Sequence, residues 1–153
     1  MQRASKCCVP HLLTIAINDD SFTPTYDPGG HPVSCAVGLE TLAIYDELRP
    51  WENVEALAPL FQGFFRERYA GHPAVGEVRG QGFMLAVELV PTAEAPAPAT
   101  ILANAAMELG LLVRSTGKVA VMAPSLVFTQ ENFEEMFDKF DRAFKRFEAE
   151  VGA

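Results

Sequence analysis

Arg114 is the charged residue whose setting most suggests binding chemistry. It follows the apolar run Leu111–Val113 and precedes a turn-forming segment at 115–118, so it should stand at the end of a strand. An arginine in that position can present its planar guanidinium group to a carboxylate through two parallel hydrogen bonds. The alternative, which the residues alone favour, is a surface arginine in an ordinary salt bridge.

Three closely spaced glycines, Gly76, Gly80 and Gly82, raise the question of a nucleotide-binding loop. Their order does not match the Gly-x-Gly-x-x-Gly pattern, because Gly80-Gln81-Gly82 is followed by the apolar residues 83–85. We therefore expect these glycines to serve tight turns or a bulge between strands, where a residue without a side chain is favoured.

The cysteines and histidines do not form a metal-binding pattern. Cys7, Cys8 and His11 are close in sequence, but their spacing fits no zinc site. His31 and His72 each stand between a glycine and a proline, a setting typical of turns and helix starts. We therefore predict no metal. An odd number of cysteines, two of them adjacent, also disfavours a disulfide framework and indicates reduced thiols.

Length and charge restrict the class of protein. The chain has 153 residues, which suits one domain with a buried core. A formal net charge of -8 disfavours nucleic acid and anionic membranes as partners, because acidic residues outnumber basic ones. No apolar run is long enough to span a bilayer. These features together predict a cytoplasmic protein.

The periodicity of apolar residues predicts a mixed succession of elements. Helices are expected at 31–49, 51–69, 99–109 and 129–151, and strands at 75–78, 83–90, 111–114 and 119–122. Because the strands are close in sequence, they should pair antiparallel. The fold class is therefore α+β, with a small antiparallel sheet of about three or four strands covered by helices and a long C-terminal helix.

The first and last helices have the clearest expected faces. The apolar residues of 31–49 form a wide face, which predicts that this helix is largely buried. The last helix should begin after Thr129, a good N-cap, and should pack through an apolar stripe. Acid–base pairs four residues apart are expected on its opposite face: Glu135 with Lys139, Asp138 with Arg142, and Asp141 with Lys145.

Four segments in register resemble the class III aminotransferases, specifically the omega-transaminase group. They are Gly30–Ala36, Val75–Gly82, Gly110–Arg114 and Val121–Pro124, the last followed by Phe128-Thr129 and the final helix. The resemblance covers residues 25–153 and is strong through the order and spacing of the segments, since each alone is weak. It divides the chain into an atypical segment, 1–24, and a region similar to the C-terminal small domain of these fold-type I enzymes.

The resemblance implies roles for two residues. Arg114 corresponds to the arginine that binds the substrate carboxylate and swings aside for amines that lack one. Thr25, in Thr25-Tyr26, corresponds to a threonine that reaches the cofactor phosphate of the partner subunit. Here residues 27–29 separate this pair from Gly-His-Pro, where the family usually has one residue, so the chain departs from the pattern by an apparent two-residue insertion.

The family's cofactor is pyridoxal 5'-phosphate, which requires a lysine that holds it covalently. In the family this lysine belongs to a large domain upstream of the segments seen here. Of the four lysines in the sequence, only Lys6 precedes the motifs, and Ser5-Lys6-Cys7 does not resemble the family's lysine context. No catalytic residue is therefore assigned to this chain, and by itself it should be inactive.

Three hypotheses follow from the resemblance. The chain is part of a transaminase that moves an amino group between an amine or amino acid and a keto acid such as pyruvate, with an aminotransferase large domain or a homodimer partner completing the site. Alternatively, it is a non-catalytic module that packs on a partner aminotransferase through an exposed apolar patch. In the third hypothesis it is a remnant without function, which should be poorly soluble or partly unfolded.

Overall fold

The computed structural model describes residues 32–152, and the chain divides into two compact units with the boundary between Arg49 and Pro50. In the first unit the described part is one helix, α2 (Pro32–Leu48). The predicted boundary between 24 and 25 lies outside the described residues and stays a prediction. Within residues 32–152, no helix combines the length and the apolar character that crossing a bilayer requires.

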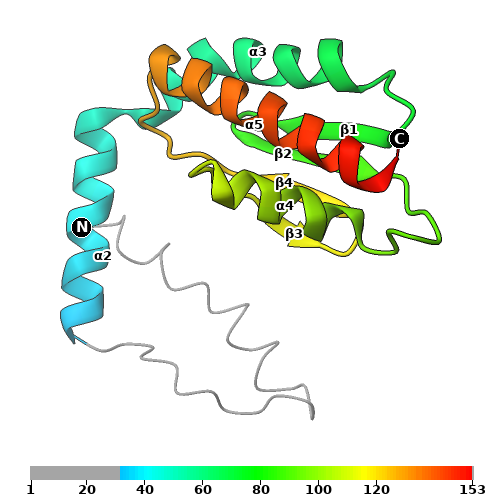
Figure 1. The fold of residues 1–153 in the computed structure, drawn as a ribbon. Helices are drawn as coiled ribbons and strands as arrows, with labels where there is room; N and C mark the ends of the chain where they lie inside the picture. Colours follow the sequence, from blue (N-terminus) through cyan, green and yellow to red (C-terminus); the bar gives the residue numbers. More distant parts are fainter. Residues whose placement is uncertain (1–31, 153) are drawn as a thin grey trace. The chain divides into compact units, whose positions relative to one another are not determined.

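The second unit is built on an antiparallel sheet whose strands lie in the order β1-β2-β4-β3 (Figure 1). The strands are β1 (Val75–Gln81), β2 (Met84–Leu89), β3 (Arg114–Thr116) and β4 (Val119–Met122). The helices of this unit are α3 (Pro50–Tyr69), α4 (Pro98–Glu108) and α5 (Gln130–Val151). This confirms the α+β class, the small antiparallel sheet and the long C-terminal helix.

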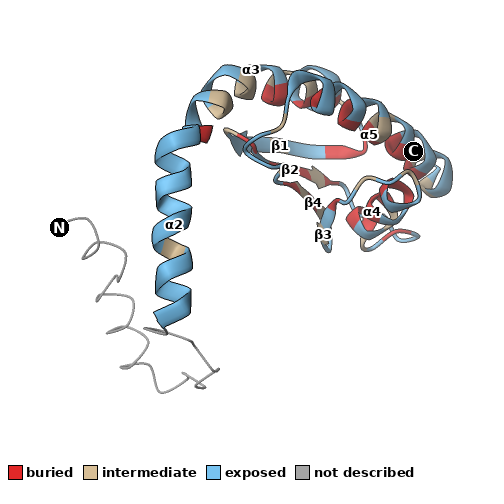
Figure 2. Cartoon of the chain, turned by 90° about the vertical axis from the view of Figure 1, so that its left-hand side faces the viewer, coloured by how far each residue is buried: buried red, intermediate tan, exposed pale blue. Residues whose placement is uncertain are grey.

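Helices cover one face of this sheet and leave the other uncovered. Leu85, Val87 and Leu89 of β2 alternate along the strand and are buried, as are Ala120 and Met122 of β4. The cross-strand pairs Leu85–Met122 and Val87–Ala120 show that these side chains share one face, which packs on the helices. The intervening residues of β2 and β4 are exposed or partly buried, so their side chains project from the uncovered face. Figure 2 marks the buried, partly buried and exposed residues along the strands.

The last helix agrees with its sequence pattern at both its start and its packing face. Thr129 is the N-cap, and it forms a capping box in which its side chain accepts from the Asn132 N–H and Asn132 accepts from the Thr129 N–H. The apolar stripe forms much of the core: Phe133, Met136, Phe137, Phe140, Phe144 and Phe147 are buried, with Val151 partly buried. Phe137 stacks on Phe64 of α3 with ring centroids 3.9 Å apart.

The glycines of the β1–β2 hairpin serve backbone geometry, as expected. The register between the strands shifts between Val75 and Glu77, so Gly76 sits at a bulge. Gly82 lies in the connecting turn with φ of 57°, a conformation that favours glycine. These glycines belong to a hairpin, as the sequence pattern indicated.

Two details of the predicted elements are wrong. The strand expected at 111–114 is instead Arg114–Thr116, because Gly117, with φ of 58°, makes a tight turn and the strand runs directly up to it. The expected pair of Asp141 with Lys145 is absent, because Asp141 faces α3 and binds Arg68 at 2.6 Å. The other two pairs form, Glu135 with Lys139 at 2.7 Å and Asp138 with Arg142 at 3.3 Å.

The expectation that the helix at 31–49 is largely buried is also wrong for the described chain. None of the residues of α2 is buried, and its large apolar side chains are between 42 and 64 % exposed, from Ile44 to Val33. An apolar face shows that burial is favourable, but it does not say which molecule provides the cover.

Candidate functional site on the uncovered face of the sheet

Arg114 lies in an edge strand and projects from the uncovered face of the sheet. It pairs with Val121, and Val121 pairs in turn with Ala86, which pairs with Arg79. Directly opposed residues in antiparallel strands point to the same face, so these four side chains form one row across the sheet. Val113, which precedes Arg114, is buried on the other side, as the alternation of a strand requires.

The next row on the same face carries two facing carboxylates. Glu77 of β1 is paired in register with Glu88 of β2. Arg79 Nη1 contacts both of them, at 2.6 Å from Glu77 Oε2 and 2.8 Å from Glu88 Oε2, and Lys118 Nζ lies 2.7 Å from Glu88 Oε1. Hydrogen bonds from Lys118 and Arg79 hold the pKa of Glu88 below its usual range, so this carboxylate is ionised at neutral pH.

Arg114 differs from its basic neighbours on this face. Arg79 and Lys118 are both in ion pairs, whereas Arg114 is exposed and forms no ion pair with any described residue. The pairing of β3 with β4 fixes its backbone, but its guanidinium group is open to bind an anion from outside. The chemistry available at this face is therefore the recognition of a carboxylate.

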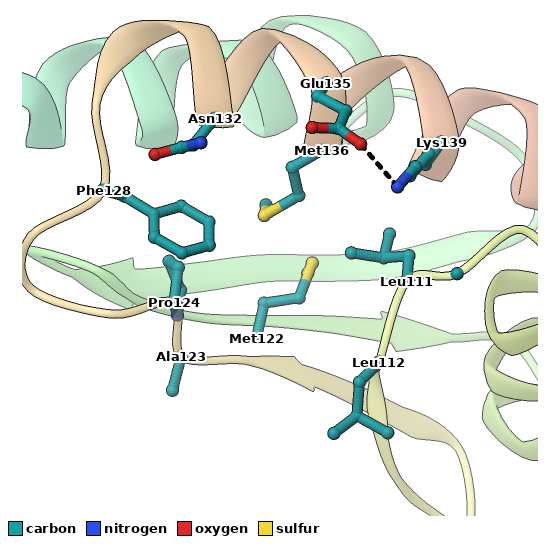
Figure 3. A pocket seen from close by; sticks show the side chains of 11 residues that line it. Leu111, Leu112, Met122, Ala123, Pro124, Phe128, Asn132, Glu135, Met136 and Lys139 are labelled. Carbon is teal, nitrogen blue, oxygen red and sulfur yellow. Dashed lines mark ion pairs between the residues drawn. The ribbon is translucent and has the colours of Figure 1, made fainter.

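A pocket that sequence reasoning missed lies on the helix side of the sheet, between α5 and the segments around 111 and 122–128 (Figure 3). Its volume is about 300 Å³, and its walls are mainly apolar. Lys139 stands at its rim in the ion pair with Glu135. The sequence placed this pair on the solvated face of α5; in the structure Lys139 lies beside Gly110 and is partly buried, while Glu135 stays exposed. The lining residues are Gly110, Leu111, Leu112, Met122, Ala123, Pro124, Phe128, Asn132, Glu135, Met136 and Lys139.

The loop after β4 is fixed by a single polar side chain. Asn53 of α3 donates from Nδ2 to the carbonyl oxygen of Leu126 at 2.8 Å and to that of Phe128 at 2.9 Å. These bonds satisfy two backbone acceptors that have no strand partner. They hold the loop where Phe128 closes one end of the pocket and Val127 is left exposed.

The described residues do not by themselves fit a pyridoxal cofactor. Lys118 and Lys139 are committed to ion pairs, and Lys145 is exposed on α5. Thr25 and Lys6, the other residues weighed for cofactor contacts, lie outside the described residues. Within 32–152 there is also no group of three or more histidine, cysteine and acidic side chains that could hold a metal ion.

His72 shows how one of the weighed histidines is used. Its Nδ1 accepts a hydrogen bond from the Ala74 N–H at 3.2 Å, and its Nε2 lies 2.9 Å from Glu148 Oε1. The ring also meets the edge of Phe144. Both nitrogens are therefore occupied in joining the end of α3 to α5.

Comparison with known proteins places these features in a family context. The family model described as Aminotransferase class-III matches residues 4–144. A probable gamma-aminobutyrate transaminase 3, mitochondrial, from Oryza sativa subsp. indica is 35% identical over 138 residues, which are 86% of this chain and 27% of that relative.

Solved structures agree. A structure described as a co-factor free transaminase superposes with a TM-score of 0.76 at 35% identity, covering 94% of this chain and 35% of that one. The omega-transaminase from Pseudomonas jessenii, solved in complex with PMP, superposes with a TM-score of 0.73 at 30% identity, covering 79% of this chain and 28% of that one. The chain thus spans between a quarter and about a third of the length of these proteins.

Proposed function

Because the chain belongs to the class III aminotransferases, we propose that it supplies the small domain of an omega-type transaminase. The reaction moves an amino group between an amine or amino acid and a keto acid such as pyruvate. The observation that carries this proposal is Arg114, exposed on the uncovered face of the sheet and without an ion pair among the described residues.

In this proposal Arg114 recognises the carboxylate of the amino-acid or keto-acid substrate. A guanidinium group offers two parallel donors to a carboxylate, which fixes both the position and the orientation of the substrate. The edge position of β3 leaves the side chain free on one flank, so it can swing aside when an amine without a carboxylate binds.

The proposed cofactor is pyridoxal 5'-phosphate, which supplies the electron sink for transamination when bound. The described residues do not fit it, so the lysine that holds it belongs, in this proposal, to an aminotransferase large domain, and Thr25 contacts its phosphate. The chain by itself is then inactive. We assign it to the cytoplasm, where its cysteines would stay reduced.

The proposed partner is that large domain, within a homodimeric assembly. Two surfaces of the described residues support this assignment, each considered by itself. One is the apolar surface of α2, with Val37 and Leu48 60 and 61 % exposed. The other is the uncovered face of the sheet, where Met84 is 67 % exposed. Apolar area left open to this extent is typical of protein–protein contact sites.

The same exposed surfaces favour a second candidate function, that of a non-catalytic module packing on a partner aminotransferase. The two candidates differ in whether Arg114 meets a substrate. The densely packed core of α3, the sheet and α5 argues against the third hypothesis, a partly unfolded remnant.

A chimera tests the proposal directly. The matching segment of the Pseudomonas jessenii omega-transaminase is replaced by this chain, and transamination is followed with one amine donor and two acceptors, pyruvate and an aldehyde without a carboxylate. We expect the chimera to use both acceptors. Arg114→Ala should raise the KM for pyruvate by about tenfold or more, the loss of a hydrogen-bonded charge pair, and should leave the KM for the aldehyde nearly unchanged.

Arg146→Ala is the matched control, because Arg146 is also an exposed arginine but pairs with Glu108 at 3.0 Å between α4 and α5. It should change neither KM. A folded, dimeric chimera without activity would favour the non-catalytic module. Equal losses with pyruvate and aldehyde in Arg114→Ala would remove the carboxylate-binding role.

A further inference from the structure

The two facing carboxylates on the uncovered face would repel each other without their basic neighbours. Glu77 and Glu88 are directly opposed across β1 and β2, an arrangement that is unfavourable for like charges. Arg79 bridges the two, and Lys118 holds the second oxygen of Glu88. Each carboxylate oxygen of Glu88 is therefore paired with a cation, Oε2 with Arg79 and Oε1 with Lys118.

Glu88 is also the acid placed to compete for Arg114. Within the four described strands the only acidic residues are Glu77 and Glu88, and Glu88 lies on the nearer strand. It is separated from β3 by β4 alone and is offset from Arg114 by two residues along the strands, because Glu88 pairs with Val119 and Arg114 pairs with Val121. Strand spacing and rise put its Cα about 12 Å from that of Arg114. An extended arginine and an extended glutamate can close this span over Val121.

We propose that Arg79 and Lys118 are positioning residues that hold Glu88 away from Arg114, so that Arg114 stays free to bind the substrate carboxylate. This inference rests on the proposed transaminase function. The observation behind it concerns three basic residues on the same face of the sheet. Arg79 and Lys118 are paired with Glu88, whereas Arg114 forms no ion pair among the described residues.

The competition matters because Glu88 is part of the same molecule. Its lowered pKa means that it carries its charge at neutral pH. A tethered carboxylate acts at an effective concentration in the millimolar range for a short flexible link, similar to that of many substrates. Released from its two partners, Glu88 would inhibit keto-acid binding from within the chain.

The first test uses the chain itself and does not depend on activity. Side-chain NMR of the Arg114 Nε–H is compared in the wild type and in Arg79→Gln/Lys118→Gln, each with and without Glu88→Gln. We expect Glu88→Gln to leave the Arg114 signal unchanged in the wild type and to shift it in the double variant, where the new ion pair forms. If Glu88→Gln does not shift the Arg114 Nε–H signal in the double variant, the inference is overturned.

If the double variant does not fold, the single variant Lys118→Gln gives the same comparison with one partner removed. Arg146→Gln, which loses an exposed pair elsewhere, is the control and should not move the Arg114 signal. A crystal structure of the folded variant should show Arg114 and Glu88 within 4 Å of each other, and separate side chains would contradict the proposal.

The second test uses the active chimera. The double variant should raise the KM for pyruvate by about two- to fivefold, the strength of an exposed ion pair, with kcat and the KM for the aldehyde unchanged. Adding Glu88→Gln should restore the KM for pyruvate, a rescue that a merely structural role of the two cations does not predict. A KM that stays high in the triple variant contradicts the inference.

The two proposals fail separately. If the chimera is inactive but the NMR comparison shows the new ion pair, the transaminase function fails and the control of Arg114 by Glu88 stands. If the chimera is active and the NMR comparison shows no ion pair between Arg114 and Glu88, only the further inference fails.

Discussion

Single residues in this fold are constrained by backbone proximity and by buried polar contacts. Gly80 of β1 lies close to the backbone of β2. A Cβ atom at this position would stand 2.2 Å from the carbonyl oxygen of Met84 and 2.8 Å from the Cα of Leu85, so the backbone of the hairpin would have to move.

We predict that Gly80→Ala destabilises the second unit by roughly 1–3 kcal/mol, because the added methyl group overpacks the hairpin. Chemical denaturation measures the change. Gly63→Ala is the control, since Gly63 lies inside α3 and its added Cβ would meet only a side-chain atom at 3.9 Å. That variant should gain up to about 1 kcal/mol through better helix propensity. If Gly80→Ala and Gly63→Ala changed the free energy of unfolding by similar amounts, the steric argument would be contradicted.

Tyr69 links stability to alkaline pH. Burial and its hydrogen bond to Asp141 raise the pKa of the Tyr69 hydroxyl well above its usual range, so it stays protonated in the folded chain. The unfolded tyrosine ionises near pH ~10. Its contribution to stability is therefore complete below that pH and is lost as the pH rises further toward the folded pKa.

We predict that Tyr69→Phe lowers stability at neutral pH by about 1 kcal/mol through the lost hydrogen bond. It should also reduce the decline in stability above pH ~10, measured by denaturation at several pH values. Tyr45→Phe, a change at a tyrosine that is 44 % exposed on α2, should alter neither quantity. An unchanged alkaline decline in Tyr69→Phe would show that other groups cause it.

At the scale of elements, α5 and α2 differ most in how far their residues are buried. α5 is strongly amphipathic, is capped at both ends and buries a continuous aromatic stripe against α3 and the sheet. α2 carries a wide apolar face, and none of its residues is buried. A helix of this length gains most of its stability from packing, and none of the residues of α2 is buried.

We therefore predict that amide hydrogens of α2 exchange far faster than those of α5 in the chain by itself, since opening α2 exposes no buried contacts. Hydrogen–deuterium exchange by mass spectrometry measures both helices in one sample. In the chimera α2 should become protected while α5 changes little. Equal protection of α2 and α5 in the isolated chain would contradict the view that α2 needs a partner.

At the scale of the whole molecule, the proposed carboxylate-binding residue, Arg114, belongs to this chain, whereas the lysine that holds the cofactor is proposed to belong to a large domain. Titration of the chain with pyridoxal phosphate, followed by absorbance, should therefore show no saturable covalent signal that an amine donor reverses. Lys6→Ala is the informative variant, because Lys6 is the one lysine upstream of the family motifs. A saturable signal in the wild type that disappears in Lys6→Ala would make this chain a complete, minimal enzyme.

The sequence by itself determined the elements whose signals are local. The cap at Thr129, the aromatic stripe of α5, strand β4 and the turn and bulge glycines follow from patterns within a few residues of each other. The family followed from four motifs in register, because their order along the chain is readable without knowing where they meet in space.

Only the tertiary structure decided which charges meet. Asp141 binds Arg68 of α3 instead of the lysine one turn away, and Glu88 is held by Arg79 of β1 and by Lys118 from the turn between β3 and β4. It also left the residues of α2 largely exposed and placed Lys139 at the rim of a pocket. These outcomes depend on strand register and helix docking between segments far apart in sequence, and local periodicity carries no information about them.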